Sequence, residues 1–380
     1  MVGDRLSVPT ASTRPHSSAP ARSVSLDVLR AIAVILVMGT HLPQASPASL
    51  GSALRLFTEF IKRGGWVGVD MFFVLSGFLV SGLIFQEFQR TGGVAVRRFL
   101  VRRGFKIYPA YYALLSATVI AILWGKYLIP LRWVGYSAVF AANYLPAAWD
   151  HLWTLSVEEH FYFALAALTA WELRSGRRGE PFRSLPIVVG ALVALCLTGR
   201  ILTSNAHPTE WWLVREPTHL RIDSLGIGVL LAYVKFFRLN LWLRVIRRRR
   251  ILLCTGFAAL LPPFFVEYDI IRPVYGAAFL LYALGSAALI TGVHGSHKTA
   301  SLPARMFAWV GRRSYSLYLW HLPMQLVATR LIQIEHDWVM FVIVYVLLSF
   351  GAGLVSWICI EEPAIRLRDG LQTRLVRSGT

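Results

Sequence analysis

Residues 25–43 read SLDVLRAIAVILVMGTHLP, an apolar run that carries an arginine near one end and a histidine near the other. Ten uncharged residues separate Arg30 from His41. In a helix, eleven steps of roughly 100° place both side chains on one face, roughly 16 Å apart along the axis. An ionisable group at the centre of a membrane helix costs about 2.5–3.5 kcal/mol and marks a functional site by default. We therefore expect this stripe to face the interior of a helix bundle.

The composition of the whole chain favours a helical membrane protein. Of 380 residues, 56% are hydrophobic and 16% are charged, whereas soluble proteins average about 25% charged residues. The apolar residues form runs of about 18–25 residues, the length of a membrane-spanning helix, between basic or Pro/Gly-rich loops. Alternating ten-residue strands, the pattern of a membrane β-barrel, are absent. The sequence thus predicts an all-α polytopic fold.

The net charge of +19 does not indicate nucleic-acid binding. The Lys and Arg residues concentrate in loops between apolar runs, as cytoplasmic loops do. The three cysteines, Cys196, Cys254 and Cys359, all lie within apolar runs. We expect them to be small core residues, with no disulfide, no metal site and no bound cofactor.

Loop charges predict ten membrane-spanning helices with both termini in the cytoplasm. Run 131–147 contains Arg132, Asn143 and Pro146, so we interpret it as a re-entrant or external-face segment. The expected spans are 26–43, 66–86, 107–124, 152–173, 184–203, 220–237, 250–267, 272–293, 307–331 and 337–360. The expected cytoplasmic loops are 87–106, 174–183, 235–250 and 294–306, and the expected outer loops are 44–65, 125–151, 204–219, 268–271 and 332–336.

The sequence predicts that the chain has three parts. Residues 1–24, rich in Ser, Pro, Ala and Arg, are expected to be a disordered cytoplasmic tail, with a transit peptide as the alternative. Residues 25–365 form the membrane domain, and residues 366–380 form a basic cytoplasmic tail. The first apolar run is too long for a signal peptide and is interpreted as a span.

Ionisable residues inside the apolar runs are the candidate site. Two adjacent carboxylates, Glu158 and Glu159, lie within one run, and neighbouring helical residues point about 100° apart. We expect one of them to face the cavity and orient His41 as a base. Asp70 falls at the depth of His41, with an interfacial cap as the alternative. Arg221 is hypothesised to pair with one of the two glutamates, whereas His151 and His160 are expected to be interfacial or packing residues.

A second group lies at the cytoplasmic ends of the spans and could bind the phosphates of a donor or of anionic lipid. The donor-binding candidates are Arg30, Arg102, Arg103, Lys106 and Tyr108. We expect a supporting polar cavity to contain Asp70, Ser156, Arg221, Asp223, Ser314, Tyr315, His321 and Glu361.

Seven blocks, taken in order, make the chain similar to the membrane acyltransferase 3 family. The blocks are Arg30 to His41, Gly65 to Phe78, Arg102 to Tyr112, Trp153 to Tyr162, Arg221 to Gly228, Ser314 to His321 and Ile360 to Pro363. The resemblance covers residues 25–365. His160 stands where the family more often has Gln, and Lys106 stands where Arg is usual, which keeps the charge but loses the bidentate fork.

The resemblance implies transfer of an acyl group, usually acetyl from cytoplasmic acetyl-CoA as co-substrate, to a hydroxyl of a glycan or glycolipid of the cell envelope. It implies that Arg30 and His41 are the essential pair, with Glu158 and Glu159 catalytic, in a multi-pass protein of the bacterial inner membrane. His41 then acts either as general base or as acyl carrier. The expected partners are acyl-CoA, the acceptor and membrane lipid.

The main alternative is a transporter or flippase of a lipid-linked glycan, with the same charges lining a passage. Many transporters show duplicated halves with interrupted helices, and no such pairing is evident here. A receptor-like binding module is a second alternative, but it needs no Arg/His stripe next to a basic donor mouth.

Overall fold

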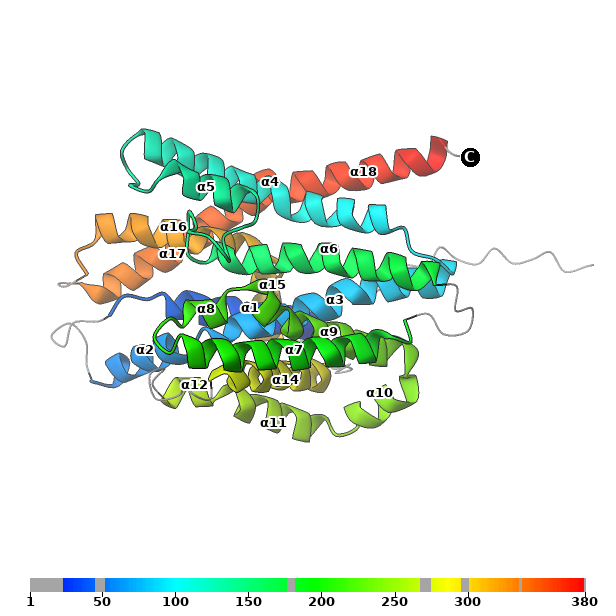
Figure 1. The fold of residues 1–380 in the computed structure, drawn as a ribbon. Helices are drawn as coiled ribbons and strands as arrows, with labels where there is room; N and C mark the ends of the chain where they lie inside the picture. Colours follow the sequence, from blue (N-terminus) through cyan, green and yellow to red (C-terminus); the bar gives the residue numbers. More distant parts are fainter. Residues whose placement is uncertain are drawn as a thin grey trace, which may run out of the picture.

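The computed structural model describes residues 23–44, 52–175, 182–266, 275–294, 301–334 and 337–378, and every regular element in these ranges is a helix. The all-α prediction is therefore confirmed. The long helices lie side by side along one common direction (Figure 1). The elements are α1 (Val24–Thr40), α2 (Ser52–Gly64), α3 (Val67–Thr91), α4 (Val96–Leu123), α5 (Leu131–Ala138), α6 (Leu152–Arg174), α7 (Leu185–Ala206), α8 (Trp212–Arg215), α9 (Thr218–Phe237), α10 (Leu239–Ile246), α11 (Arg249–Leu260), α12 (Pro262–Phe265), α14 (Tyr275–Val293), α15 (Leu302–Arg312), α16 (Ser314–Leu331), α17 (Trp338–Ser356), a π-helical turn (Trp357–Glu361) and α18 (Glu362–Ser378).

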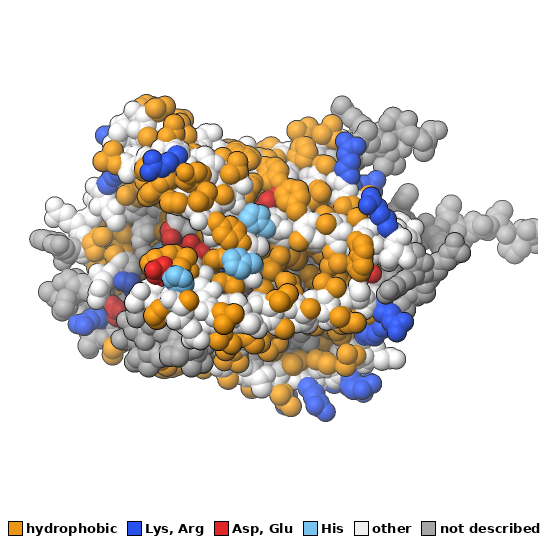
Figure 2. Space-filling view, viewed as in Figure 1, with side chains coloured by type: hydrophobic (Ala, Val, Ile, Leu, Met, Phe, Trp, Pro, Cys, Tyr) orange, Lys and Arg blue, Asp and Glu red, His pale blue; other side chains and the backbone are white. Residues whose placement is uncertain are grey.

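The described helices are those of a multi-pass membrane protein. Five helical segments are long and apolar enough to cross a membrane, namely Val67–Thr91, Val96–Leu123, Leu185–Ala206, Gly276–Val293 and Trp338–Leu371. On the face shown in Figure 2, hydrophobic side chains form a broad middle band, and Lys and Arg lie toward its two ends. The count of ten spans and the placement of the termini remain predictions.

Three predicted boundaries are wrong. Helix α4 begins at Val96, so much of the predicted loop 87–106 is helical; Arg and Lys favour helices and lay their stems along apolar surface. The predicted span 250–267 breaks after Leu260, before two prolines. Its twelve-residue helix α11 extends only about 18 Å. The predicted span 307–331 is divided at Arg313 into α15 and α16.

Several expected loops also contain helices. The outer loop 44–65 contains α2, and the predicted tail 366–380 continues as helix α18 to Ser378. Run 131–147 contains only the eight-residue helix α5, too short to cross a membrane, as expected for a segment on one face. The predictions for residues 1–22 and 268–271 lie outside the described residues.

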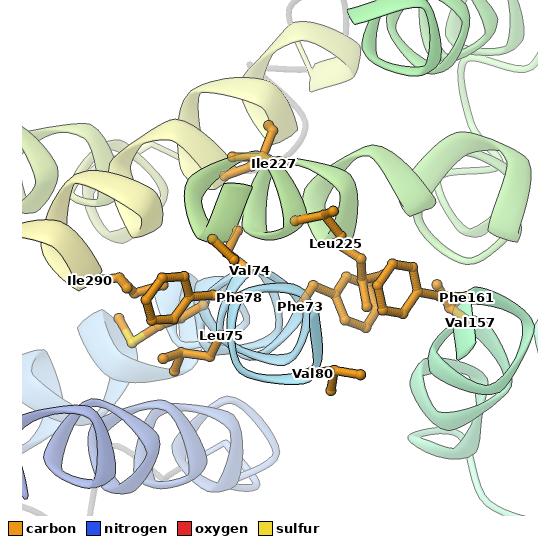
Figure 3. Close-up of a cluster of buried hydrophobic side chains, with 14 of the residues drawn as sticks. Phe73, Val74, Leu75, Phe78, Val80, Val157, Phe161, Leu225, Ile227 and Ile290 are labelled. Carbon is orange, nitrogen blue, oxygen red and sulfur yellow. The ribbon is translucent and has the colours of Figure 1, made fainter. Parts of the chain in front are cut away.

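Helix α3 lies among the other helices and supplies much of the core (Figure 3). Its side chains Phe73 and Phe78 are buried, and they meet Leu225 from α9, Phe161 from α6 and Ile290 from α14 in one hydrophobic cluster. A helix that is apolar on every side is either enclosed by neighbours or exposed to lipid, and most of the apolar part of α3 is enclosed by other helices. It therefore fixes the positions of the helices that carry the candidate site.

Glycines bring α3 close to two of these neighbours. A Cβ added at Gly68 would lie 2.5 Å from the carbonyl oxygen of Ala33 on α1, as expected from the glycines at the start of this span. A Cβ at Gly77 would overlap the carbonyl oxygen of Leu225 on α9. Small residues allow the backbones of membrane helices to approach in this way. Helix α3 thus depends on glycine at both contacts.

Replacing Gly77 tests this packing. The Gly77→Ala change must push α3 and α9 apart, and overpacking of this kind costs about 1–3 kcal/mol. We expect a clearly lower midpoint of thermal unfolding in detergent. The control is Gly190→Ala on α7, where no atom lies within 4 Å of the added Cβ. Equal midpoints for the two variants would contradict the close contact.

Candidate functional site

Two neighbouring cavities contain most of the candidate residues. We name them the Arg30 cavity and the His41 cavity, after an arginine on α1 and the histidine that caps the C-terminal end of α1. They share Val69 and Tyr318, which therefore form the wall between them. The Arg30 cavity is lined by Arg30, Val69, Phe72, Phe73, Leu75, Ser76, Val80, Arg103, Lys106, Ile107, Thr154, Leu155, Glu158, Tyr162, Ser314, Tyr315 and Tyr318. The His41 cavity is lined by Val37, Thr40, His41, Arg63, Trp66, Val69, Asp150, His151, Trp153, Trp211, Arg215, Arg221, Phe279 and Tyr318.

Three cations line the Arg30 cavity. Arg30 lies 3.6 Å from Asp27 on its own helix, and the guanidinium of Arg103 lies 5.6 Å from the ring centre of Tyr162. Lys106 makes a short ion pair with Glu361, a fully buried carboxylate. The structure thus gathers three of the four predicted donor-binding cations. The fourth, Arg102, is exposed and does not line this cavity.

The carboxylate of Glu361 lies at the end of the π-helical turn, where the normal helical register is interrupted. Besides its contact with Lys106, Glu361 accepts a hydrogen bond of 2.8 Å from Ser316 on α16. The Tyr315 hydroxyl donates to the carbonyl oxygen of Ile107 at 2.7 Å. These bonds connect α4, α16 and the π-helical turn, so they hold the cationic side of the cavity in place.

The adjacent glutamates point to different places, as the helical spacing predicts. Glu158 lines the Arg30 cavity and accepts a hydrogen bond of 3.2 Å from Tyr162. Glu159 accepts a short hydrogen bond from Tyr108, and its Oε2 is buried with no partner among the described residues. Neither lines the His41 cavity. The expectation that a glutamate orients His41 is therefore wrong.

The ring next to His41 is another histidine. The ring centres of His41 and His321 lie 5.2 Å apart, and those of His321 and His151 lie 4.9 Å apart. His151 and His321 are buried. Burial of His151 against these rings is consistent with its expected packing role, and it also places this residue, which directly precedes α6, beside the end of α1. We name the three residues His41, His151 and His321 the histidine cluster.

A proline on α16 sets the hydrogen bonds of the cluster. Pro323 has no N–H, so the carbonyl of Leu319, four residues earlier, has no helical donor. Nε2 of His151 lies 3.1 Å from this carbonyl oxygen, and Nδ1 of His321 lies 2.5 Å from that of Tyr318. A ring nitrogen facing a carbonyl must donate, so we assign the proton to these atoms. Nδ1 of His151 and Nε2 of His321 then keep free lone pairs, and neither has a partner among the described residues.

Two buried ion pairs support the His41 cavity. Arg221 donates to Asp70 at 2.7 Å, and both side chains are almost completely buried. Arg200 binds Asp223 through two hydrogen bonds of 2.9 and 2.8 Å. The hypothesis that Arg221 pairs with Glu158 or Glu159 is therefore wrong, and the burial of Asp70 argues against the alternative of an interfacial cap. The second pair could have been suspected from the sequence, because Arg200 lies within the apolar run 184–203.

The remaining candidates serve packing or lie near the site. Ser156 is buried and donates to Leu152 of its own helix at 3.3 Å, away from both cavities. His160 bonds Thr218 at 2.7 Å, which fits its expected packing role. Sequence reasoning missed the wall residue Tyr318. Its hydroxyl hydrogen-bonds Thr154 at 2.6 Å and the carbonyl of His151 at 2.9 Å.

Removing one charge of the Asp70–Arg221 pair should destabilise the folded protein more than removing both. The Asp70→Asn change leaves the Arg221 guanidinium buried without its counter-charge, which costs about 3–5 kcal/mol. The double variant with Arg221→Gln removes both charges and should recover part of this loss. Thermal unfolding in detergent measures both.

The matched control is Arg366→Gln, which breaks an exposed i,i+4 pair with Glu362; such pairs contribute about 0–1 kcal/mol. Equal losses of the unfolding midpoint in Asp70→Asn and Arg366→Gln would show that the Asp70–Arg221 pair is not a stabilising buried ion pair.

Comparison with known proteins places these residues in a known family. A family model described as an acyltransferase domain matches residues 23–361. The O-acetyltransferase OatA of Staphylococcus aureus is 26% identical over 360 residues, which cover 89% of this chain and 56% of that protein. The peptidoglycan O-acetyltransferase OatA of Listeria monocytogenes is 27% identical over 372 residues, 89% of this chain and 55% of that protein.

The chain spans about half the length of these curated relatives. No solved structure matches it significantly. Since the match to the family model covers most of the chain and all residues that line the two cavities, the chain belongs to the acyltransferase 3 family.

Proposed function

We propose that this chain transfers an acyl group, most simply acetyl, from a cytoplasmic acyl-CoA to a hydroxyl of a cell-envelope glycan or glycolipid. Family membership supports acyl transfer, and the two relatives named as O-acetyltransferases support a hydroxyl acceptor. The Listeria protein is named for peptidoglycan, which supports an envelope glycan. The protein then works as a multi-pass enzyme of the bacterial cytoplasmic membrane.

The observation that carries this proposal is the pair of cavities with a common wall. One has cations from α1 and α4 and suits the phosphates of CoA. The other contains His41 and suits the reacting hydroxyl. Arg30 on α1 and His41 at its C-cap are roughly 16 Å apart along the helix axis, a separation that a pantetheine arm can span. Val69 and Tyr318 lie where the thioester would pass.

We place the Arg30 cavity on the cytoplasmic side, with ten crossings and both termini inside. The basic residues of α4 and α18 support this orientation, because positive charge favours the cytoplasmic side. These helices contact one another, and both carry arginines near that contact. The acceptor then enters the His41 cavity from the outer side.

Two chemical routes fit the histidine cluster. In the first, His41 takes the proton of the acceptor hydroxyl, the oxygen attacks the thioester carbon, and the carbon–sulfur bond breaks as CoA thiol leaves. In the second, an imidazole nitrogen attacks first and holds the acyl group until the hydroxyl displaces it. In the first route His41 gives the same proton to the leaving CoA sulfur; in the second the attacking imidazole must lose a proton, and the lone pair of His321 Nε2 next to His41 is available to accept it.

Loss of His41 tests the function. With labelled acetyl-CoA and a glycan acceptor, His41→Ala should lower the transfer rate about 10²–10⁴-fold, the contribution of a positioned base. His207→Ala is the control, because His207 is an exposed histidine at the end of α7. Transfer at the wild-type rate by His41→Ala would refute the proposal, whereas label trapped on His41 without acceptor would select the carrier route.

Pro323→Ala tests the role of the histidine cluster. The new N–H competes with His151 for the carbonyl of Leu319, so the His151 ring loses its fixed position. We expect a lower kcat, an unchanged KM for acetyl-CoA, and an unfolding midpoint no lower than that of the wild type. Pro303→Ala, at the exposed start of α15, should change none of these. An unchanged kcat in Pro323→Ala would remove His151 from the mechanism.

A further inference from the structure

Two arginines present unused hydrogen-bond donors in the His41 cavity. Nε and Nη1 of Arg221 and Nε of Arg215 are buried and have no hydrogen-bond partner among the described residues. Both arginines line the cavity. A buried donor without a partner costs about 1–3 kcal/mol, and more when it is charged. A bound ligand could supply the hydrogen-bond acceptors that these donors lack among the described residues.

The hydrogen bonds within the protein use only some of the nitrogen atoms of each guanidinium. Arg221 bonds Asp70 through Nη2 at 2.7 Å and stacks 3.7 Å from the ring centre of Phe279. Arg215 bonds Glu216 through Nη2 at 2.6 Å and stacks 3.7 Å from the ring centre of Trp211. Each side chain is therefore held by at least one carboxylate and one aromatic face. Nε of Arg215 and Nε and Nη1 of Arg221 are therefore fixed in position but unused.

Aromatic rings connect the two arginines. The guanidinium of Arg215 also lies 5.4 Å from the ring centre of Trp153, and that of Arg221 lies 5.7 Å from Phe73. Trp153 and Phe73 pack edge to face at 6.0 Å. These rings hold both guanidinium planes, so little conformational freedom is lost when a ligand binds. The arrangement is a prepared site rather than two mobile surface arginines.

The charges lining the cavity indicate what the site binds. Its described lining contains three arginines and one carboxylate, Asp150, which lies 3.8 Å from Arg215; Asp70 and Glu216, outside the lining, also pair with Arg221 and Arg215. A planar guanidinium matches carboxylate and phosphate oxygens better than a neutral hydroxyl. The imidazoles His41 and His151 line the same space. A ligand anion held by the arginines would therefore bring its hydroxyls near the histidine cluster.

We propose that Arg215 and Arg221 form a subsite for an anionic group, a carboxylate or a phosphate, on the acceptor glycan. The proposal rests on the proposed function and narrows its acceptor to acidic saccharides. The anion accepts hydrogen bonds from the unused guanidinium nitrogens, and the sugar lies between them and His41. The subsite selects the acceptor by charge and takes no part in breaking the thioester.

Binding is measured first, on His41→Ala protein in detergent, so that it does not depend on catalysis. The probes are a tetrasaccharide of alternating glucuronate and N-acetylglucosamine, its carboxyl-reduced form, and the reduced form carrying a phosphate ester. Tryptophan fluorescence reports binding, because Trp211 stacks on Arg215. We expect at least tenfold tighter binding of one anionic probe than of the reduced form, and the preferred probe identifies the anion.

Arg215→Gln should remove this preference. Arg215 lies on the short helix α8 and is partly exposed, so its loss is tolerated better than that of buried Arg221. Arg221→Lys, which keeps the charge facing Asp70, should reduce the preference by about tenfold without loss of folding. Arg132→Gln, on exposed α5 outside the cavity, should leave it unchanged.

Equal binding of all three saccharides, or a preference that survives both Arg215→Gln and Arg221→Lys, overturns the proposal. Transfer assays with the wild-type protein separate this failure from that of the function. Equal acetylation of acidic and neutral saccharides overturns the subsite alone. No transfer to any saccharide, despite charge-dependent binding, overturns the proposed function and leaves the anion site standing.

Discussion

The ion pair between Asp70 and Arg221 is the interaction on which the site depends. Both charges are buried in an apolar bundle, where neither is stable without the other. The pair joins α3 to α9 beside the His41 cavity, and about two turns further along α3 the glycine contact of Gly77 brings the same helices together. Arg221 can therefore line the cavity, and α3 can supply Val69 to the wall shared with the Arg30 cavity.

The histidine cluster depends on a local irregularity in a helix. Pro323 takes one hydrogen bond away from α16, and the chain uses the free carbonyl of Leu319 to hold His151. A helix without proline at this position would leave His151 with no fixed partner there. Bonds of Thr154 and Tyr318 hold the same region from two helices. The site is thus built from backbone groups as much as from side chains.

The fold class could be predicted from sequence because lipid imposes long apolar helices, and such runs are visible in any chain. Helix breaks at Leu260 and Arg313 were missed, because an apolar run can continue across the point where one helix stops and another begins. Arg30, His41 and Glu158 were found because ionisable residues inside apolar runs are costly, and Lys106 was found because basic residues at span ends can bind phosphates. Their partners were not found. Helical spacing fixes the face of a residue on its own helix, but the pairing of Arg221 with Asp70 depends on how separate helices pack.

The central claim is that the acyl group crosses the membrane from donor to acceptor, and one experiment measures this directly. Protein in sealed proteoliposomes is given labelled acetyl-CoA outside, with the acceptor saccharide trapped inside. Copies whose Arg30 cavity faces outward should label the trapped acceptor while CoA stays outside, and His41→Ala should abolish the label. The account would be contradicted if the acceptor became labelled only when donor and acceptor were in the same compartment. The two cavities would then open to the same side of the membrane.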